Sequence, residues 1–400
     1  MLLVLTAAAV TVRVLVLVRT PGLPFDMSSI RAAGDQLRSS PLDLYALNPA
    51  DGRTPVWPYG PVFAAWAAIP AALFDVSSMA WQVSSRLLQV CADLLVGLLA
   101  VNHLAQRGAG MPRRTAAYAL VVAGPVLLLV SGIHGQIDVV AFAASCGALL
   151  LWVRGGSHRA VAAGLLIAVG LAVKQPSALL LIPMLLDARR LRERVTLVAA
   201  AVVPAALVTL PFVAQQPDGF RAAVGYDGIL GFGGTVFLLQ PSLAMARIVG
   251  GAPHPIGAVR QLRSISSVIV LVALALAVYL IHRWRVPLED AWAVLALLVP
   301  AVAPVSAPWY FSWGVITLAM AGRLRSCLAL QVVALVPMVL LYRGLFGGLL
   351  PDSSTVSAFV TRVAVHLYAP SMIVLAAVSA AIAVRLLLLA RSAQVGSAVP

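Results

Sequence analysis

Long apolar runs, separated by short polar stretches, dominate the chain. With a window of about 19 residues, these runs predict about twelve membrane-spanning helices. The predicted spans lie near 2–19, 84–106, 115–132, 136–153, 160–174, 175–187, 195–213, 264–282, 289–306, 309–322, 326–345 and 364–389. The pattern therefore predicts an all-α membrane protein, a polytopic helical bundle.

Arginines recur between the predicted spans, and the alternation of the spans puts these arginines on one side. They are Arg107, Arg113, Arg114, Arg154, Arg159, Arg189, Arg190, Arg192, Arg194, Arg283, Arg285, Arg323, Arg325 and Arg391. Short arginine-rich connections mark the cytoplasmic side. Both termini are then cytoplasmic, and the long loops 20–83 and 214–263 lie outside.

Two further apolar segments, 59–75 and 236–250, would reverse this alternation if they were counted as spans. We therefore predict that both are helices within the outer loops, buried against protein or re-entrant at the interface. A single transmembrane domain over residues 1–392 is predicted, with a polar tail at 393–400. Residues 1–18 lack a basic n-region and a cleavage signal, so they are expected to remain as the first span.

Composition supports the membrane class and excludes others. Apolar residues make up 61% of the chain and charged residues 10%, against roughly 25% charged in soluble domains. The net charge of +14 follows the span ends and forms no basic cluster beside stacking aromatics, so it does not indicate nucleic acid. The three cysteines fall in apolar spans, which predicts small buried residues. No metal or cofactor is predicted.

Polar interruptions carry the candidate chemistry. His134, Gln136 and Asp138 interrupt two apolar runs, and Lys174 and Gln175 end the next run on the same predicted outer face. Lys174 is the only lysine in the chain. A lone lysine at a span end can snorkel to the interface. Ionisable groups are costly at such a place, however, and two polar breaks on one face favour a ligand site.

The first outer loop adds a carboxylate to that face. Asp26 follows the first span directly, and the segment Trp57 to Pro61, which includes Tyr59, is predicted to return to the membrane plane. A carboxylate, a lysine and arginines suit a lipid with an anionic phosphate. Asp26 would take a proton from an attacking hydroxyl, while Lys174, with Arg221 or Arg263, would compensate the leaving phosphate.

A nucleotide-sugar donor is disfavoured. The glycine-rich stretch Gly231-Phe232-Gly233-Gly234 lacks the following Lys-Ser/Thr and the preceding strand of a phosphate-binding loop.

Together these motifs resemble the glycosyltransferase C superfamily. They are the aspartate after the first span, the aromatic and proline-rich return, the His-x-Gln-x-Asp break and the Lys-Gln-Pro break. The two breaks are similar to those of dolichyl-phosphate-glucose-dependent glucosyltransferases. The size and the segment Ser306-Ala307-Pro308-Trp309-Tyr310 look more like actinobacterial polyprenol-phosphate-mannose-dependent mannosyltransferases. Many relatives carry a paired acidic motif in the first loop, where this chain has Ser28 two residues after Asp26.

The resemblance implies an inverting transferase that moves a hexose, with mannose favoured, from a polyprenyl monophosphate to a lipid-linked glycan on the outer face. His134, Gln136 and Tyr59 would then orient the sugar or phosphate, and Gln175 and Asp138 would join the donor site. The partners would be the polyprenyl-phosphate sugar, the glycan acceptor and membrane lipids.

Several alternatives remain open. Asp26 could be a helix cap near Ser28, His134 a satisfied histidine at a helix end, and Asp138 a structural partner of a cation. Arg13, within the first span, is expected to snorkel outward or to mark a span whose position is wrong. At the level of function, a transporter or lipid flippase could use Lys174 and Asp138 as coupling residues. A non-catalytic subunit of a cell-wall complex is the third possibility.

The predicted sidedness can be tested with impermeant thiol reagents on intact cells. In a chain without its native cysteines, a cysteine placed near Arg38 should react from outside, and one near Arg192 should react only after permeabilisation. The opposite pattern of labelling would overturn the assignment of the outer face.

Overall fold

The structure is a computed structural model that describes residues 2–48, 56–226, 228–245, 254–347 and 362–397. These residues form helices and turns, with no strand among them, which confirms the all-α prediction. Each of the twelve predicted spans is helical over most of its length. Seven helices within the described residues are long and apolar enough to cross a membrane. The count of about twelve spans stays a prediction.

The chain divides into two compact units, Met1–Tyr226 and Asp227–Pro400. The predicted single transmembrane domain over residues 1–392 stays a prediction. The first unit contains α1 (Leu2–Arg19), α2 (Pro24–Ser39), η1 (Leu44–Leu47), α3 (Pro61–Leu73), α4 (Met79–Gln106), α5 (Met111–Val122), α6 (Pro125–Leu127), the π-helix η2 (Leu128–His134), α7 (Asp138–Arg154), α8 (Arg159–Val173), η3 (Gln175–Ser177), α9 (Ala178–Asp187), α10 (Leu191–Gln215) and α11 (Pro217–Val224).

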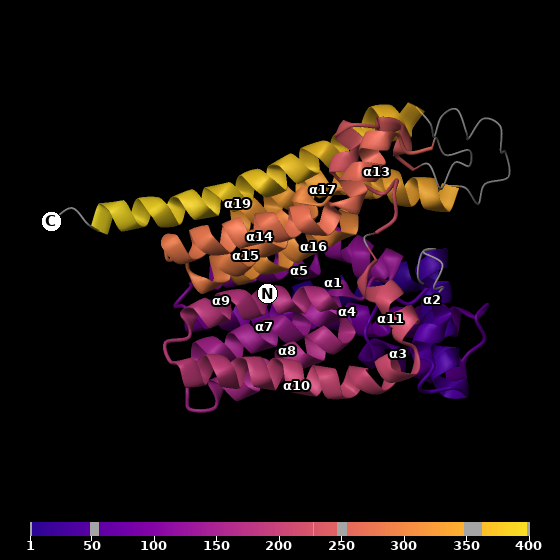
Figure 1. The fold of residues 1–400 in the computed structure, drawn as a ribbon, viewed down its shortest axis with the longest axis horizontal. Coiled ribbons are helices and arrows are strands. Elements are labelled where there is room, and N and C mark those ends of the chain that lie inside the picture. The colour runs from indigo at the N-terminus through magenta and orange to yellow at the C-terminus, as the bar shows by residue number, and fades with distance from the viewer. Residues whose placement is uncertain (1, 49–55, 227, 246–253, 348–361, 398–400) are drawn as a thin grey trace. The chain divides into compact units, whose positions relative to one another are not determined.

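Small residues let the helices of the first unit approach closely. Helices α7, α8 and α10 lie side by side (Figure 1). A Cβ atom on Gly164 of α8 would lie 2.6 Å from the Cβ of Ala200 on α10. A Cβ on Gly170 would lie 2.5 Å from the Oγ of Ser177. Packing of this kind holds helices together where the surroundings are as apolar as the side chains.

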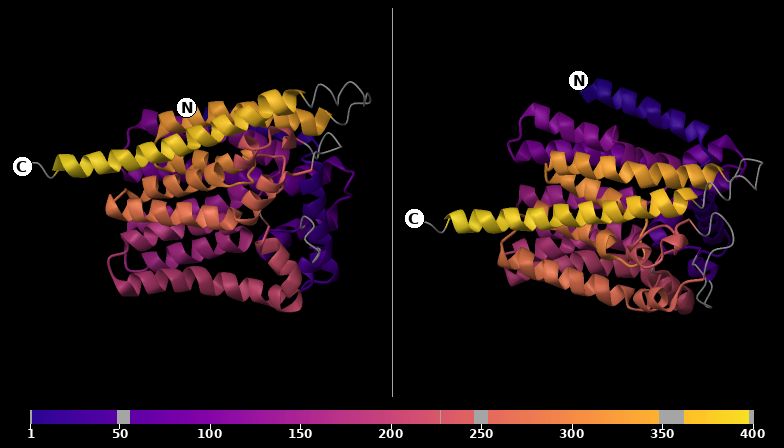
Figure 2. Two further views of the ribbon diagram at one scale, coloured as in Figure 1. Left: turned by 45° about the horizontal axis from the view of Figure 1, so that its top comes forward. Right: turned by 90° about the horizontal axis from the view of Figure 1, so that it is seen from above.

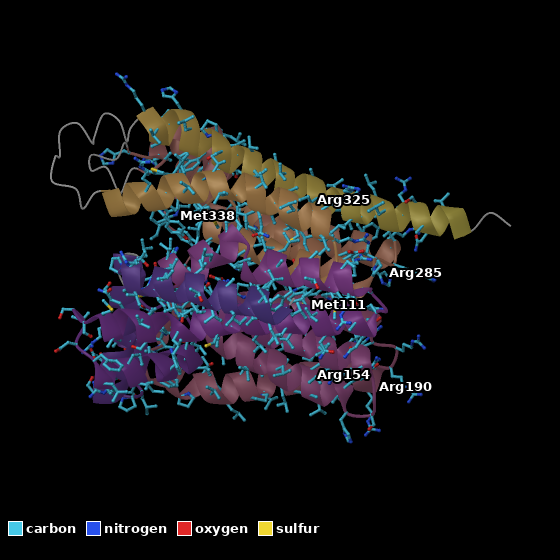
Figure 3. All side chains as sticks on the ribbon, turned by 180° about the vertical axis from the view of Figure 1, so that it is seen from behind. Met111, Arg154, Arg190, Arg285, Arg325 and Met338 are labelled. Carbon is cyan, nitrogen blue, oxygen red and sulfur yellow. The ribbon has the colours of Figure 1, made fainter. Side chains whose placement is uncertain are left out.

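The hairpin of α7 and α8 has arginines at one end and the polar breaks at the other. Asp138 begins α7 and Arg154 ends it, while Arg159 begins α8 and Lys174 follows its end. A helix of 17 residues is about 25 Å long, so the polar breaks lie far from the arginines. Arg154 and Arg190 lie at the same end of the first unit's helices (Figure 3). This arrangement is the one that the predicted topology requires.

The loop 20–83, which is predicted to lie outside, is folded, and its core is shared with residues of α7, α8 and α11. The predicted helix at 59–75 is present as α3, which packs against α2. Its buried core includes Tyr45, Trp57, Phe63 and Trp81. Burial of each such ring stabilises the fold by about 1.5–3 kcal/mol. The Asn48 amide also ties this loop to α11, since it donates to the carbonyls of Trp57 in the loop and Gly219 in α11.

Arg13 does not snorkel, and that expectation was wrong. Its side chain is 1% exposed and forms an ion pair with Asp93 of α4 at 3.1 Å. It also donates to the carbonyl of Val122, and Ser131 donates to the same carboxylate. An unpaired charge inside the helical packing is costly, and a partner on the neighbouring helix removes that cost. The prediction that all three cysteines are buried holds for Cys146 and Cys327 but is wrong for Cys91, which is exposed on α4.

The second unit is also helical. It contains η4 (Thr235–Leu238), η5 (Pro241–Leu243), α13 (Gly257–Ser264), α14 (Ser266–Arg283), α15 (Leu288–Val302), η6 (Pro308–Phe311), α16 (Ser312–Met320), α17 (Leu324–Gly347), the π-helix η7 (Ala364–Tyr368) and α19 (Ala369–Ser397). Helix α19, drawn in yellow, runs along α17 (Figure 2). Two charged hydrogen bonds from Arg323 to Asp290 join the start of α15 to the connection before α17.

The predicted helix at 236–250 is only partly testable. Residues 236–245 form two short 3₁₀ turns in place of a continuous helix, and 246–250 lie outside the described residues. The backbone explains the turns, because Gly233, Gly234 and Met245 all have positive φ. The amides of Thr235 and Val236 donate to the carbonyls of Ala303 and Pro304, so this loop is tied to the end of α15.

Candidate active site

Asp26 and His134 form a hydrogen-bonded pair. Nε2 of His134 lies 2.8 Å from Oδ2 of Asp26. The His134 side chain is fully buried, whereas the Asp26 side chain remains 10% exposed. A ligand approaching this pair would therefore reach the carboxylate and not the imidazole. Asp26 also lies in the first turn of α2, where the helix N-terminus favours negative charge.

Gln136 completes this first cluster. Its Nε2 lies 3.3 Å from Oδ1 of Asp26 and 3.3 Å from Nε2 of His134. With His134 donating to Oδ2 and Gln136 to Oδ1, each carboxylate oxygen accepts one hydrogen bond. Since each oxygen of an ionised carboxylate can accept two, both retain capacity for a ligand hydroxyl.

Local backbone geometry turns His134 toward Asp26. The chain leaves the π-helix η2 at His134, and Gly135 then adopts a φ of +83°. A π-helix widens the turn and is frequent at functional sites. A side chain at Gly135 would also collide with Met27, whose Cε would lie 2.5 Å from an added Cβ. The amide of Leu23 donates to the carbonyl of His134, which joins the two segments directly.

Lys174 and Asp138 form a second cluster. Nζ of Lys174 lies 2.8 Å from each carboxylate oxygen of Asp138. The ammonium also lies 5.0 Å from the ring centroid of Tyr59, a cation–π distance. Asp138 is fully buried at the start of α7 and Lys174 is almost buried after the end of α8. The pair joins the two helices at the end opposite their arginines.

The loop 20–83 positions Tyr59 over this lysine. The amide of Gly60 donates to the carbonyl of Val173 at 3.0 Å. A Cβ on Gly60 would lie 2.0 Å from the carbonyl oxygen of Ala172, so only glycine permits this approach. The hydroxyl of Tyr45 donates to the carbonyl of Tyr59, and burial raises the pKa of Tyr45, which keeps that hydroxyl protonated.

A short segment links the two clusters. His134 and Asp138 are four residues apart, and a stretch of four residues spans at most about 14 Å. The partner of Asp26 and the partner of Lys174 are thus carried by one piece of backbone.

The other three predicted site residues are Gln175, Arg221 and Arg263. Gln175 follows Lys174 directly, where it begins η3 and is exposed. Arg221 forms an exposed ion pair with Asp218 on α11 at 2.8 Å. Arg263 lies in the last turn of α13, which belongs to the second unit.

The sequence analysis missed Arg86 and Gln89, which lie buried on α4 beside the site. Gln89 donates to the carbonyl of Gly135 at 3.1 Å, and Arg86 donates to the carbonyl of Gly132. Both hold the segment that carries His134. A signal for Arg86 was present, because an ionisable residue inside an apolar run is by default a candidate functional residue.

The sequence signature of glycosyltransferase family 87 matches residues 57–308, more than half of the chain. This range includes every predicted site residue except Asp26. No curated protein matches the chain.

Two solved structures share the fold. The chain is similar to the crystal structure of ArnT from Cupriavidus metallidurans in the apo state, with a TM-score of 0.54 and 17% identity over 96% of this chain and 76% of that one. The structure of ArnT bound to undecaprenyl phosphate gives a TM-score of 0.52 and 16% identity, over 96% and 77% of the two chains. At these identities the likeness concerns the fold.

Proposed function

Because this chain belongs to glycosyltransferase family 87, we propose that it transfers a hexose from a polyprenyl monophosphate to a lipid-linked glycan. The transfer takes place on the extracytoplasmic face and inverts the configuration at the anomeric carbon. Mannose is the favoured sugar, on the resemblance of the Ser-x-Pro-Trp-Tyr segment to mannosyltransferases. The observation that carries this proposal is the partly exposed Asp26 carboxylate, held by two buried side chains.

Asp26 acts as the general base in this proposal. The acceptor hydroxyl donates its hydrogen bond to the carboxylate, and its proton passes to Asp26 as the oxygen bonds to the anomeric carbon. The bond from that carbon to the phosphate oxygen breaks on the opposite side, so the configuration inverts. The phosphate leaves as an anion on the polyprenyl chain, which removes the need for the general acid of a two-carboxylate hydrolase.

We infer a positioning role for His134 and Gln136 in addition to the sugar or phosphate contact expected from sequence. The His134 imidazole is fully buried and lies within hydrogen-bond distance of Asp26, which supports a role in holding the base. A hydrogen bond from each residue fixes the direction of the carboxylate lone pairs. Such positioning is worth much in catalysis, because an error of 1 Å can cost about 10²-fold in rate.

Lys174 supplies positive charge on the donor side. Its ammonium is hydrogen-bonded to the Asp138 carboxylate, so the two side chains together carry no net charge before the donor binds. The donor phosphate would accept a further hydrogen bond from this ammonium. The half-buried ring of Tyr59 offers a face for the sugar or the lipid phosphate. The undecaprenyl phosphate in the ArnT complex supports a polyprenyl phosphate as the lipid. Arg221 and Arg263 stay candidates for further phosphate contacts.

Transport by Lys174 and Asp138 is the weaker reading. Coupling sites of transporters lie near the membrane midplane, between inverted repeats. Here the pair lies at one end of α7 and α8, opposite Arg154 and Arg159. The family match to a glycosyltransferase also favours transfer.

Donor use can be tested with the purified protein in lipid nanodiscs. Polyprenyl phosphates carrying labelled mannose, glucose or arabinose are offered together with a membrane lipid extract as acceptor. We expect label from the mannosyl donor to enter glycolipid, and label from GDP-mannose to remain outside it. Incorporation from the nucleotide sugar with polyprenyl phosphate absent would contradict the proposed donor, and transport of the intact donor across the bilayer without transfer would favour the flippase.

Replacing Asp26 with Asn keeps the shape of the side chain and removes the base. We expect transfer to fall by about 10²-fold or more, the range for loss of a general base, with unchanged protein level. Asp35→Asn is the matched control on the same helix, because Asp35 pairs with Arg31 at the loop surface. An Asp26→Asn enzyme within a few-fold of wild type would remove Asp26 from catalysis.

Lys174→Met separates a donor contact from a structural ion pair. The single variant leaves Asp138 buried without its counter-charge, so a loss of activity alone decides nothing. We therefore compare it with the double variant Lys174→Met/Asp138→Asn, in which the buried charge is also removed. If Lys174 compensates the donor phosphate, kcat/KM for the donor should stay reduced by at least about tenfold in the double variant, since such charge pairs are worth about 2–5 kcal/mol. Full recovery would show that the lysine serves only to balance Asp138.

A further inference from the structure

Arg86 is a buried arginine whose donors are all used. Its Nε donates to the carbonyl of Gln82 at 2.8 Å, within its own helix. One terminal nitrogen donates to the hydroxyl of Thr20 at 2.9 Å and to the carbonyl of Gly132 at 2.6 Å. The other donates to the carbonyls of Leu17 at 2.8 Å and Thr20 at 2.5 Å. A guanidinium has five N–H donors, and here each has a neutral acceptor.

Apart from the Gln82 carbonyl, these acceptors lie on the two chain segments that bear the candidate catalytic pair. Leu17 lies in the last turn of α1, and Thr20 follows the helix directly. Thr20 is six residues before Asp26. Gly132 lies in η2, two residues before His134. The carbonyls at a helix C-terminus lack helical partners and attract positive charge. The Arg86 guanidinium therefore clamps the end of α1 to the end of η2.

The stem of Arg86 packs on the same two segments. An added Cβ on Gly135 would lie 3.1 Å from Cγ of Arg86, and one on Gly22 would lie 3.4 Å from its Cδ. Both glycines have positive φ and both face Met27. Hence the turn that leads to Asp26 and the turn that follows His134 meet on one side chain.

We propose that Arg86 is a positioning residue that sets the hydrogen bond between Asp26 and His134. This inference rests on the proposed function, in which that bond orients the base. Lysine could keep the positive charge in this place but has three donors on a single nitrogen. The five acceptors around Arg86 outnumber these donors, so at least two of them would lose their partner. The shape of the guanidinium, more than its charge, fixes the distance between the two segments.

Arg86→Lys tests the proposal, because a positioning role and a substrate contact change kcat and KM differently. With the mannosyl polyprenyl phosphate donor, we expect kcat to fall by about 10- to 100-fold, as for a small misplacement of a catalytic group. KM for the donor should change by less than about threefold, because Arg86 is fully buried and touches no substrate. The matched control is Arg159→Lys, which alters an arginine paired with Glu193 at the far end of α8 and should leave kcat unchanged.

A second readout does not depend on any donor. The chain has six histidines, and ¹⁵N-histidine labelling gives the imidazole signals of the full-length protein in lipid, with that of His134 assigned by a His134→Gln variant. Asp26→Asn defines the His134 signal when the pair lacks its carboxylate. We expect Arg86→Lys to move the His134 signal toward that of Asp26→Asn, and Arg159→Lys to retain the wild-type signal.

The two readouts separate failure of this inference from failure of the proposed function. If wild-type protein uses no polyprenyl-phosphate sugar but Arg86→Lys shifts the His134 signal, the donor is wrong and the positioning role stands. A wild-type His134 signal in Arg86→Lys would overturn the positioning role, whether or not thermal stability falls. A raised KM with unchanged kcat would also overturn it, because that pattern indicates substrate contact.

Discussion

The hydrogen bond between Asp26 and His134 joins parts of the chain that are more than a hundred residues apart. Asp26 lies in the first turn of α2 in the loop 20–83, whereas His134 ends the π-helix η2. A carboxylate in apolar surroundings needs partners, and His134 and Gln136 provide them. The folded outer loop, the turn at Gly135 and the clamp at Arg86 all serve to keep this contact.

The segment from His134 to Asp138 gives the site its organisation. One end holds the candidate base, and the other end holds the only lysine of the chain through a buried ion pair. Glycosyl transfer from a lipid phosphate needs a base on one side of the anomeric carbon and positive charge on the other. A short segment that carries a partner of each group suits this requirement. The arginine-rich ends of α7 and α8 lie away from it, as expected for a site on the outer face.

The sequence predicted the helices and singled out the residues that the structure brings into the two clusters, because both depend on local patterns. Apolar runs, the arginines between them and the polar breaks at His134 and Lys174 can be read along the chain. Pairings between helices could not be predicted in this way, because they depend on which faces meet. Arg13 was therefore expected at the interface and instead pairs with Asp93, and the five contacts of Arg86 were missed. Likewise the pairing of His134 with Asp26 was not predicted, and the expected contact of His134 with the substrate stays a prediction.

The most direct test is a cryo-electron microscopy structure of the protein with a polyprenyl phosphonate analogue of the hexosyl donor, in which a carbon replaces the scissile oxygen. We expect the phosphonate within contact distance of the Lys174 ammonium and the anomeric carbon facing the Asp26 carboxylate, with room for an acceptor hydroxyl between them. A phosphonate bound at the Arg154 and Arg159 end of α7 and α8, with Asp26 remote from the sugar, would contradict the proposed site.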